Sequence, residues 1–222
     1  MKLLNWLSSW LFPPRCILCG KLLESEETDL CRTCRIQVPE CSVSKIKYPF
    51  IDQWTALWYY EGDVRKSLLR YKFNNRRNYA VGYGRLLAMK LLREEWTDFD
   101  ILTYIPVSNR RRRKRGFDQV ELLANHVGTE LGIAPVKTLV KKRHNKQQSR
   151  IIGFAQRRAN VLGAYDVLDA SMLAGKRILL LDDIVTTGAT ASECARILLT
   201  AGAKEVRFAV IASANHQTKT NR

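Results

Sequence analysis

The sequence predicts an α/β fold, in which a mainly parallel sheet carries helices on both faces and follows a small cysteine-rich module. Two observations lead to this prediction. Short apolar runs alternate along the chain with segments of helical spacing. Four of the six cysteines form two C-x₂-C pairs ahead of the first predicted strand. With 222 residues and 46% hydrophobic composition, the chain can form one main domain and a small appendage.

The apolar runs that we expect to form strands cover residues 54–62, 101–107, 177–183 and 206–212. Aromatic, branched and leucine side chains dominate them, as in the buried strands of parallel sheets. Ligands of such sheets bind at the carboxyl ends of the strands. Because residues 104–110 and 182–190 both lie at such ends, we expect one cleft to use both segments.

Segments with helical spacing cover residues 63–73, 78–96, a stretch that starts at 118, and 190–200. We expect Asp63 to cap the first and Asp118 with Glu121 to form a capping pair at the start of the third. The buried candidates of the second are Leu87, Leu91 and Leu92. Those of the third are Val120, Leu123, Ala124, Val127 and Leu131. The polar and basic stretch 137–160 is expected to be a mobile loop.

The segment 177–193, RILLLDDIVTTGATASE, is the most informative part of the chain for function. An apolar run ends in Asp182 and Asp183, and a loop of small and hydroxyl residues then leads into a helix. A helix N-terminus attracts anions, and Gly188 lets the backbone approach a phosphate closely. The threonine hydroxyls add donors. The two carboxylates suit ribose hydroxyls or a Mg²⁺ ion held through water.

The competing interpretation of this segment is an ordinary strand, turn and helix with two solvated aspartates. Other phosphate-binding motifs fit poorly, because the chain contains neither G-x-x-x-x-G-K-[ST] nor G-x-G-x-x-G. The segment resembles the phosphoribosyl pyrophosphate loop of type I phosphoribosyltransferases. That resemblance implies that Asp182 and Asp183 bind the ribose hydroxyls, with Mg²⁺ as cofactor. It assigns the 5′-phosphate to Thr186, Thr187, Gly188, Ala189 and Thr190.

The two C-x₂-C pairs, Cys16 with Cys19 and Cys31 with Cys34, have the spacing of a tetrahedral zinc site. Two disulfides are the alternative, which a chain without a signal peptide in a reducing compartment disfavours. A redox C-x-x-C is a further alternative. About 40 residues build little core, so we expect the metal to supply the folding energy of this module.

The remaining two cysteines fall outside the zinc pattern. Cys41 is too distant to be a preferred fifth ligand, and its role stays open. Cys194 lies on the apolar face of the helix after the phosphate loop, so we expect it in the core.

The net charge of +16 is concentrated in one part of the chain. Residues 104–160 contain 14 Lys or Arg and three acidic residues, so they carry 11 of the 16 net charges. A localised field of this kind attracts polyanions. Its densest part is a run of six cations, for which a solvated charged turn is the alternative interpretation. We expect the run to contact the backbone of single-stranded DNA through Arg110, Arg111, Arg112, Arg113 and Lys114.

The end of the same run is expected to serve a second ligand. Arg binds phosphate in a bidentate manner, so we assign a pyrophosphate to Ser108, Asn109 and Arg115. The nearby aromatic side chains suit stacking on single-stranded bases or a place in the core, and both interpretations stay open for Tyr104, Phe117 and Phe154.

The order of these parts resembles the ComF family, in particular the ComFC-type proteins of bacterial natural transformation. The resemblance covers nearly the whole chain. Its matching pieces are the two cysteine pairs, residues 69–73 (LRYKF), 115–119 (RGFDQ), Gln148, Arg157 with Asn160, and residues 182–190. Two details depart from the family pattern: Asp118 stands where Asn is usual, and the arginine tract is longer.

The ComF resemblance implies a cytoplasmic competence protein at the inner face of the membrane, which supports the uptake and handling of incoming single-stranded DNA. It also implies a phosphoribosyl pyrophosphate site and suggests a competence helicase as partner. The alternative function is a phosphoribosyltransferase of nucleotide salvage or biosynthesis, in which a nucleophile displaces pyrophosphate at ribose C1. The sequence does not name the acceptor or decide whether transfer occurs.

The amino-terminal segment MKLLNWLSSWLF places Leu3, Leu7, Trp10 and Leu11 on one helical face. No run approaches the ~20 apolar residues of a transmembrane helix, and the segment lacks the cleavage site of a signal peptide. Packing on its own module and peripheral contact with a membrane surface are the two interpretations. We expect a zinc-knuckle module with this helix at residues 1–45, a phosphoribosyltransferase-like domain at 50–215 and a disordered tail at 216–222.

Overall fold

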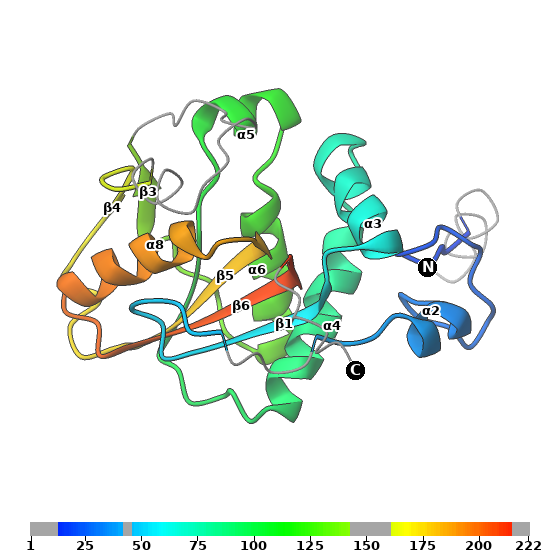
Figure 1. The fold of residues 1–222 in the computed structure, drawn as a ribbon, viewed down its shortest axis with the longest axis horizontal. Helices are drawn as coiled ribbons and strands as arrows, with labels where there is room; N and C mark the ends of the chain where they lie inside the picture. Colours follow the sequence, from blue (N-terminus) through cyan, green and yellow to red (C-terminus); the bar gives the residue numbers. More distant parts are fainter. Residues whose placement is uncertain (1–12, 42–45, 143–160, 215–222) are drawn as a thin grey trace, which may run out of the picture.

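The computed structural model describes residues 13–41, 46–142 and 161–214 (Figure 1). The expectations for the amino-terminal helix, the tail at 216–222, and the residues Gln148, Phe154, Arg157 and Asn160 lie outside this part. Within it, no helix is long and apolar enough to cross a membrane.

The centre of the protein is a four-stranded sheet in the order β1-β6-β5-β2, with all neighbouring strands parallel (Figure 1). Its strands are β1 (Gln53–Tyr59), β2 (Ile101–Tyr104), β5 (Arg177–Val185) and β6 (Glu205–Ser213). The two long central strands are mostly apolar and buried, as is typical of strands covered on both faces.

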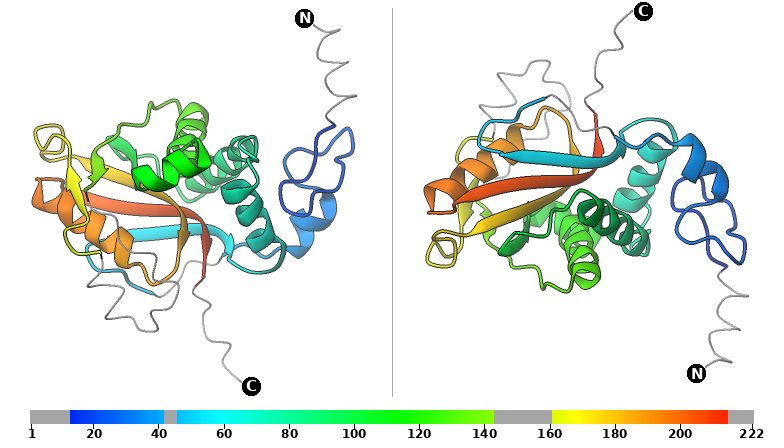
Figure 2. Two further views of the ribbon diagram at one scale, coloured as in Figure 1. Left: turned by 90° about the horizontal axis from the view of Figure 1, so that it is seen from above. Right: turned by 90° about the horizontal axis from the view of Figure 1, so that it is seen from below.

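Helices cover both faces of the sheet (Figure 2). Alternate residues of β5 separate the core into two parts: Leu179 and Leu181 face one part, and Ile178 and Leu180 face the other. The helices of the first part are α3 (Gly62–Phe73), α4 (Tyr79–Arg93) and α6 (Gln119–Leu131). The second is covered by α8 (Ala189–Thr200), whose Cys194 is fully buried. The predicted fold class and the core position of Cys194 are therefore confirmed.

The other described elements are short. A helix α2 (Arg32–Gln37) belongs to the cysteine module, and α5 (Asn109–Arg115) contains the basic run. The strands β3 (Leu139–Lys141) and β4 (Tyr165–Val167) form an antiparallel pair. The cysteine module lies against α3 and α4, and its Ile17 and Leu18 join the core on that side.

Several local predictions need correction. Leu92 is half-exposed, with 50% of its surface accessible, because α4 presents Leu87 and Leu91 to the sheet and Leu92 lies off that face. The helix α3, expected at residues 63–73, begins at Gly62 after the N-cap Glu61. Asp63 therefore lies in its first turn and is not the cap. Leu131 is only partly buried at the end of its helix.

The prediction of a loop at residues 137–160 is wrong at the start of this range. Leu139 is fully buried, and residues 139–141 pair with β4, so this stretch is a strand. The strand expected at 101–107 ends at Tyr104. The strand expected at 177–183 continues to Val185, because Ile184 and Val185 still pair with β6.

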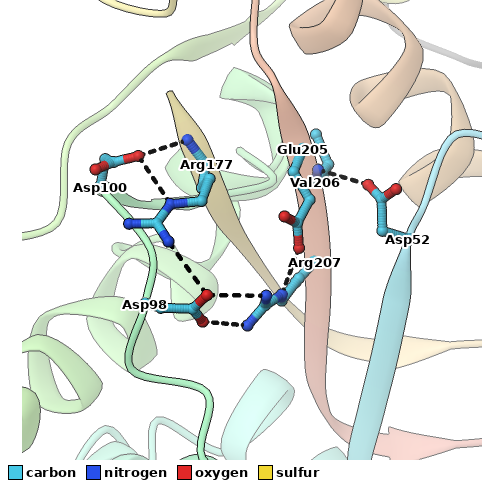
Figure 3. Close-up of polar contacts among 7 residues, drawn as sticks. All are labelled: Asp52, Asp98, Asp100, Arg177, Glu205, Val206 and Arg207. Carbon is cyan, nitrogen blue, oxygen red and sulfur yellow. Dashed lines mark hydrogen bonds and ion pairs between the residues drawn. The ribbon is translucent and has the colours of Figure 1, made fainter. Parts of the chain in front are cut away.

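Arginine and carboxylate side chains form ion pairs at the amino ends of the strands (Figure 3). Asp98 accepts from Arg177 at 3.2 Å and from Arg207 at 2.5 Å. Asp100 accepts from the backbone N–H of Arg177, and Glu205 pairs with Arg207. The arginines at this edge are thus neutralised by carboxylates, which fits a structural role for the edge.

Candidate functional site

The acidic pair lies inside β5, near its carboxyl end. Because successive side chains of a strand point to opposite faces, the two carboxylates meet different surroundings. Asp183 lies on the face covered by α3 and α6, where it contacts Lys72 and Gln119. Asp182 lies on the opposite face, where Ile178 and Leu180 pack against α8.

Asp183 is buried, and each of its carboxylate oxygens has a donor. Lys72 Nζ donates to Oδ1 at 2.7 Å, and Gln119 Nε2 donates to Oδ2 at 2.8 Å. Gln119 is held in turn, because the Tyr71 hydroxyl donates to its backbone carbonyl at 2.6 Å. Gln119 Oε1 is buried without a hydrogen-bond partner in the described part of the chain. This orphaned acceptor beside the carboxylate suits a ligand hydroxyl.

Asp182 has a different electrostatic state. Its Oδ1 accepts from the backbone N–H of Asp183 at 2.7 Å. Loss of hydration, followed by the negative charge of Asp183, raises the pKa of the Asp182 carboxyl to about 8. A cation bound here would favour the ionised form. The arrangement therefore fits a Mg²⁺ ion or ribose hydroxyls, which are the groups that the sequence assigned to the pair.

The loop after β5 is short and ends at Gly188, the N-cap of α8. Gly188 has a φ of 73°, and a Cβ there would lie 2.1 Å from Cδ1 of Tyr48. Both the backbone conformation and the packed ring therefore require glycine. Thr186 is exposed, whereas Thr187 and Thr190 are partly buried. The Thr187 hydroxyl accepts from the N–H of Ala189 at 3.4 Å. The loop thus presents hydroxyls and the start of a helix at the carboxyl edge of the sheet.

Arg115 brings an unpaired cation to the same edge. Its guanidinium lies 5.0 Å from the centroid of the Phe73 ring, and one of its nitrogens is buried without a hydrogen-bond partner among the described residues. Burial lowers the pKa of Arg115, and the nearby charge of Asp183 partly offsets this shift. A buried guanidinium nitrogen without an acceptor is costly. Arg115 therefore fits an anionic ligand such as pyrophosphate.

A cavity of about 510 Å³ opens beside these groups. Cationic side chains from α3 and α5 line it, and none of the described residues that line it has a carboxylate. The lining residues are Tyr60, Leu69, Lys72, Phe73, Asn75, Arg111, Lys114, Arg115 and Phe117. The cavity is large enough for a phosphorylated sugar.

The basic run forms a helix that divides its cations among different surroundings. Arg111, Lys114 and Arg115 have the i, i+3, i+4 spacing of one helical face, and all three line the 510 Å³ cavity. Arg112 lies 3.9 Å from Glu121. Arg110 and Arg113 are exposed and line neither this cavity nor the smaller one described next. The run is therefore continuous in sequence but not on the surface.

The residues around the basic run mostly fix its position. The Ser108 hydroxyl caps α5 by accepting from the Arg111 N–H at 3.4 Å, and Asn109 lines a small neighbouring cavity with Tyr104. Asp118 caps α6, as expected, by accepting from the N–H groups of Val120 and Glu121. Its other oxygen accepts from the Val107 N–H at 2.9 Å. An acceptor-only side chain serves all three bonds, which explains how Asp fits this position.

Two site residues that sequence analysis missed lie on the β3–β4 pair. Lys141 Nζ donates to the Tyr165 hydroxyl at 2.9 Å and lies 4.7 Å from the ring centroid. Burial, and then the charge of Arg111, lowers the pKa of Lys141, while Asp182 partly offsets the shift. Lys141 also lines the small cavity with Asn109 and Arg112 of the basic helix. Its signal was hidden because we expected residues 137–160 to form a loop.

The cysteine module has the donors for a zinc ion. The Sγ atoms of Cys16, Cys19, Cys31 and Cys34 all lie within 4.8 Å of one another. Cys19 Sγ and Cys31 Sγ are 3.7 Å apart, close to the edge of about 3.8 Å that a tetrahedron of 2.3 Å Zn–S bonds requires. All four cysteines are free, so the disulfide alternative is absent here. Cys41 is buried outside this cluster, as expected.

Helix α3 connects the cysteine cluster to the acidic pair. Ser67 Oγ donates to the Ile17 carbonyl and Arg70 donates to the Leu18 carbonyl, both inside the first C-x₂-C pair. Lys72 of the same helix contacts Asp183. The packing of the cysteine module thus bears directly on the helix that positions Lys72.

Comparison with known proteins matches both parts of the chain. Residues 114–222 match the phosphoribosyl transferase domain family, and residues 7–44 match the double zinc ribbon domain family. The chain is similar to "Competence protein F" of Haemophilus influenzae, with 24% identity over 215 residues, covering 87% of this chain and 94% of the relative. It is also similar to "Competence protein ComFC" of Streptococcus pneumoniae, with 27% identity over 226 residues, covering 87% and 97%.

A third relative is the "DNA utilization protein YhgH" of Escherichia coli K12, with 24% identity over 200 residues that cover 86% of this chain and 87% of the relative. Among solved structures, the chain partly superposes on the "allosteric regulatory enzyme of purine biosynthesis", with a TM-score of 0.44 and 21% identity. That superposition covers 64% of this chain and 29% of the other.

Proposed function

We propose that this chain, a ComF-type protein by its two domains and by relatives that match most of its length, supports the handling of incoming single-stranded DNA in natural transformation. The names of its relatives, two competence proteins and a DNA utilization protein, support this proposal. The proposal includes a cytoplasmic location at the inner face of the membrane and a competence helicase as partner. It also keeps a zinc module at residues 1–45 and a phosphoribosyltransferase-like domain at 50–215.

The second part of the proposal is that phosphoribosyl pyrophosphate binds at the carboxyl edge of the sheet. The observation that carries it is the unpartnered guanidinium nitrogen of Arg115, which lies beside a cationic cavity close to Asp183. In this assignment Asp182 and Asp183 bind the ribose hydroxyls and a Mg²⁺ ion, and residues 186–190 bind the 5′-phosphate. Arg115 and Lys72 are the cations for the pyrophosphate.

The DNA contact in this proposal is the exposed side of α5. Arg110 and Arg113 are exposed and do not line the cavity, so they remain accessible while a phosphoribosyl ligand occupies it. Phosphate contacts of this kind hold a strand without reading its sequence. The protein could therefore hold DNA and a nucleotide-like ligand at neighbouring places.

A phosphoribosyltransferase of salvage or biosynthesis is the second candidate function. The position of Lys141 favours it, because this side chain and Asn109 line the same small cavity and offer polar groups to an acceptor. The lone pair of an acceptor nitrogen would form a bond to ribose C1 as the bond from C1 to the pyrophosphate oxygen breaks. Pyrophosphate would leave with the electron pair, and Arg115 would stabilise its charge.

Both functions can be tested on one purified sample of the full chain. Calorimetry with phosphoribosyl pyrophosphate, with and without Mg²⁺, should show Mg²⁺-dependent binding that Asp182→Asn with Asp183→Asn abolishes. The exposed Asp169, changed to Asn, is the matched control and should bind normally. Equal affinity in the double variant would mean that the site lies elsewhere.

The two candidate functions separate in two further assays of the same sample. Anisotropy of a labelled single-stranded oligonucleotide measures DNA binding, and the proposal expects it to survive in the double variant. Mg²⁺-dependent release of pyrophosphate on adding ammonia or nucleobases measures transfer. Transfer without DNA binding would replace the competence role by the transferase role.

A further inference from the structure

A second cationic cavity lies where the cysteine module meets the phosphoribosyltransferase-like domain. Its volume is about 630 Å³. Three arginines line it: Arg15 from the module, Arg70 from α3 and Arg76 from the connection between α3 and α4. Its other lining residues are Pro13, Pro14, Gly20, Asn78 and Tyr79. Among the described residues that line this cavity, three are positively charged and none has a carboxylate.

The charges of these arginines are not compensated within the described part of the protein. None of Arg15, Arg70 and Arg76 forms an ion pair with a described carboxylate. Arg70 Nε is buried there without a hydrogen-bond partner. Arg177 and Arg207, at the amino ends of the strands, show the opposite arrangement, since carboxylates neutralise both (Figure 3). Uncompensated charge in a concave site indicates an anionic ligand.

The cavity is joined to the α5 face by the connection between α3 and α4, residues 74–78. Asn75 lines the 510 Å³ cavity and accepts from Arg77 Nε at 3.0 Å. Arg77 lies 4.8 Å from the ring centroid of Phe117, the residue that follows α5 and Gly116. Arg76 lines the 630 Å³ cavity. In Figure 1 α3 lies between α5 and the cysteine module, and the connection that follows α3 contributes a lining residue to each of the two cavities.

We propose that this cavity, here called the ribbon groove, binds phosphates of the same single-stranded nucleic acid that contacts α5. The inference rests on the DNA-handling function proposed above and adds a second contact region, which extends from α5 across residues 74–78 to Arg15. Arg side chains bind phosphate oxygens through paired N–H groups. A concave groove suits a flexible strand, whereas a flat membrane surface contacts protruding side chains.

The test uses the full chain with Arg15→Ala and Arg76→Ala together. Arg70 is left intact because it also holds the Leu18 carbonyl. For single strands each phosphate contact contributes roughly 0.7 to the slope of log K against log salt. The double variant should flatten this slope by about 1.4 if both arginines contact phosphate. Affinity should fall for every sequence tested, because phosphate contacts carry no base information.

A matched control variant removes two positive charges far from the groove, at the amino ends of the strands. Lys176 and Lys204 are exposed beside the amino ends of β5 and β6, and their change to Ala should leave the slope unaltered. Zinc content and thermal unfolding of both double variants establish that they are folded. If Arg15→Ala disturbs the module, the single exchange Arg76→Glu tests the same groove, because Arg76 is exposed and its side chain bonds to no described residue.

The outcomes separate this inference from the function on which it rests. Absence of DNA binding by the unaltered chain would overturn the proposed function itself. DNA binding by the unaltered chain with an unchanged slope in Arg15→Ala, Arg76→Ala and in Arg76→Glu would overturn the ribbon groove alone. Vesicles of anionic phospholipid are the second probe. If the variants lose vesicle binding and keep full DNA binding, the groove is a lipid contact and the inference is wrong.

Discussion

Lys72 and Asp183, 111 residues apart in the sequence, form an ion pair at 2.7 Å beneath the carboxyl edge of the sheet. The helix that carries Lys72 also carries Ser67 and Arg70, which hold the carbonyls between Cys16 and Cys19. One helix of 12 residues thus contacts both the cysteine module and the acidic pair. A rigid element of this kind can transmit displacement between its two ends.

We predict that loss of zinc weakens the phosphoribosyl site as well as the module. Cys16→Ser or Cys34→Ser should lower zinc content and solubility, because four thiolates are needed to close the metal site. The displaced carbonyls of Ile17 and Leu18 would release α3, so affinity for phosphoribosyl pyrophosphate should fall as well. Elemental analysis and calorimetry measure the two effects. Cys41→Ala is the control and should keep zinc. Zinc-free protein with intact thiols, purified under reducing conditions, would contradict the prediction.

The ion pair itself leads to a prediction of stability. Both side chains are largely buried, with 15% of Lys72 and 7% of Asp183 accessible. Lys72→Ala leaves a buried carboxylate with only Gln119 as donor, which should cost about 3 kcal/mol in the free energy of unfolding. Lys72→Arg keeps the charge and should cost less. Urea unfolding of the three proteins measures this difference, and equal midpoints for Ala and Arg would mean that the pair contributes only packing.

The raised pKa of Asp182 predicts how binding depends on pH. The folded pKa of about 8 lies above the ordinary carboxyl value of about 4, so the free protein keeps this group protonated at neutral pH. Its stabilising contribution is present below about pH 4 and is lost as the pH rises towards 8. Mg²⁺ and ribose hydroxyls prefer the ionised carboxylate. Affinity for the Mg²⁺ complex of phosphoribosyl pyrophosphate should therefore increase between pH 6 and 9.

Asp182→Asn is the control for this titration. The amide removes the ionisable group, so the variant should bind weakly at every pH, and its stability should vary less with pH than that of the unaltered chain. Calorimetry over the pH series provides the measurement. A pH profile that is the same in the variant would assign the titration to another group.

Gly188 allows a steric prediction with a matched control. Gly188 and Gly132 both adopt positive φ values, 73° and 70°, but only Gly188 faces a side chain within 4 Å. Gly132→Ala should therefore cost about 1 kcal/mol for backbone strain alone. Gly188→Ala adds a clash with the Tyr48 ring, so it should cost clearly more and also weaken phosphoribosyl pyrophosphate binding. Thermal unfolding of both variants separates the two contributions, and equal losses would refute the steric argument.

Much of this arrangement could be predicted from local sequence patterns. In the segment 177–200, the apolar runs and the glycine predict a strand, a loop and a helix. The spacing of the cysteines predicts the zinc site. The double zinc ribbon and phosphoribosyl transferase matches and the competence-protein relatives confirm the ComF resemblance. The phosphate and DNA roles of individual residues stay predictions.

The missed features depend on distant contacts or on signals that charge concealed. Lys72 becomes a site residue only because the fold brings α3 to β5, and Lys141 only because residues 139–141 pair with β4. Two residue types in the sequence indicate the helix α5: Ser108 suits its N-cap and Gly116 suits its C-cap, and the structure has both in these positions. The six adjacent cations are equally typical of a solvated charged turn.

The last prediction separates the two uses of the basic helix. Arg110 and Arg113 are exposed and lie outside the 510 Å³ cavity, whereas Arg115 lies in it. Arg110→Ala with Arg113→Ala should flatten the slope of log K for single-stranded DNA against log salt by about 1.4, since each phosphate contact contributes roughly 0.7. Phosphoribosyl pyrophosphate binding should persist in this variant. Arg115→Ala should do the reverse, because this side chain lines the cavity and one of its buried nitrogens lacks an acceptor among the described residues. Salt titrations and calorimetry on the same proteins provide both readouts.

If the Arg110 and Arg113 variant binds DNA with unchanged slope, α5 does not contact DNA through its exposed side, and the transferase becomes the stronger of the two candidate functions.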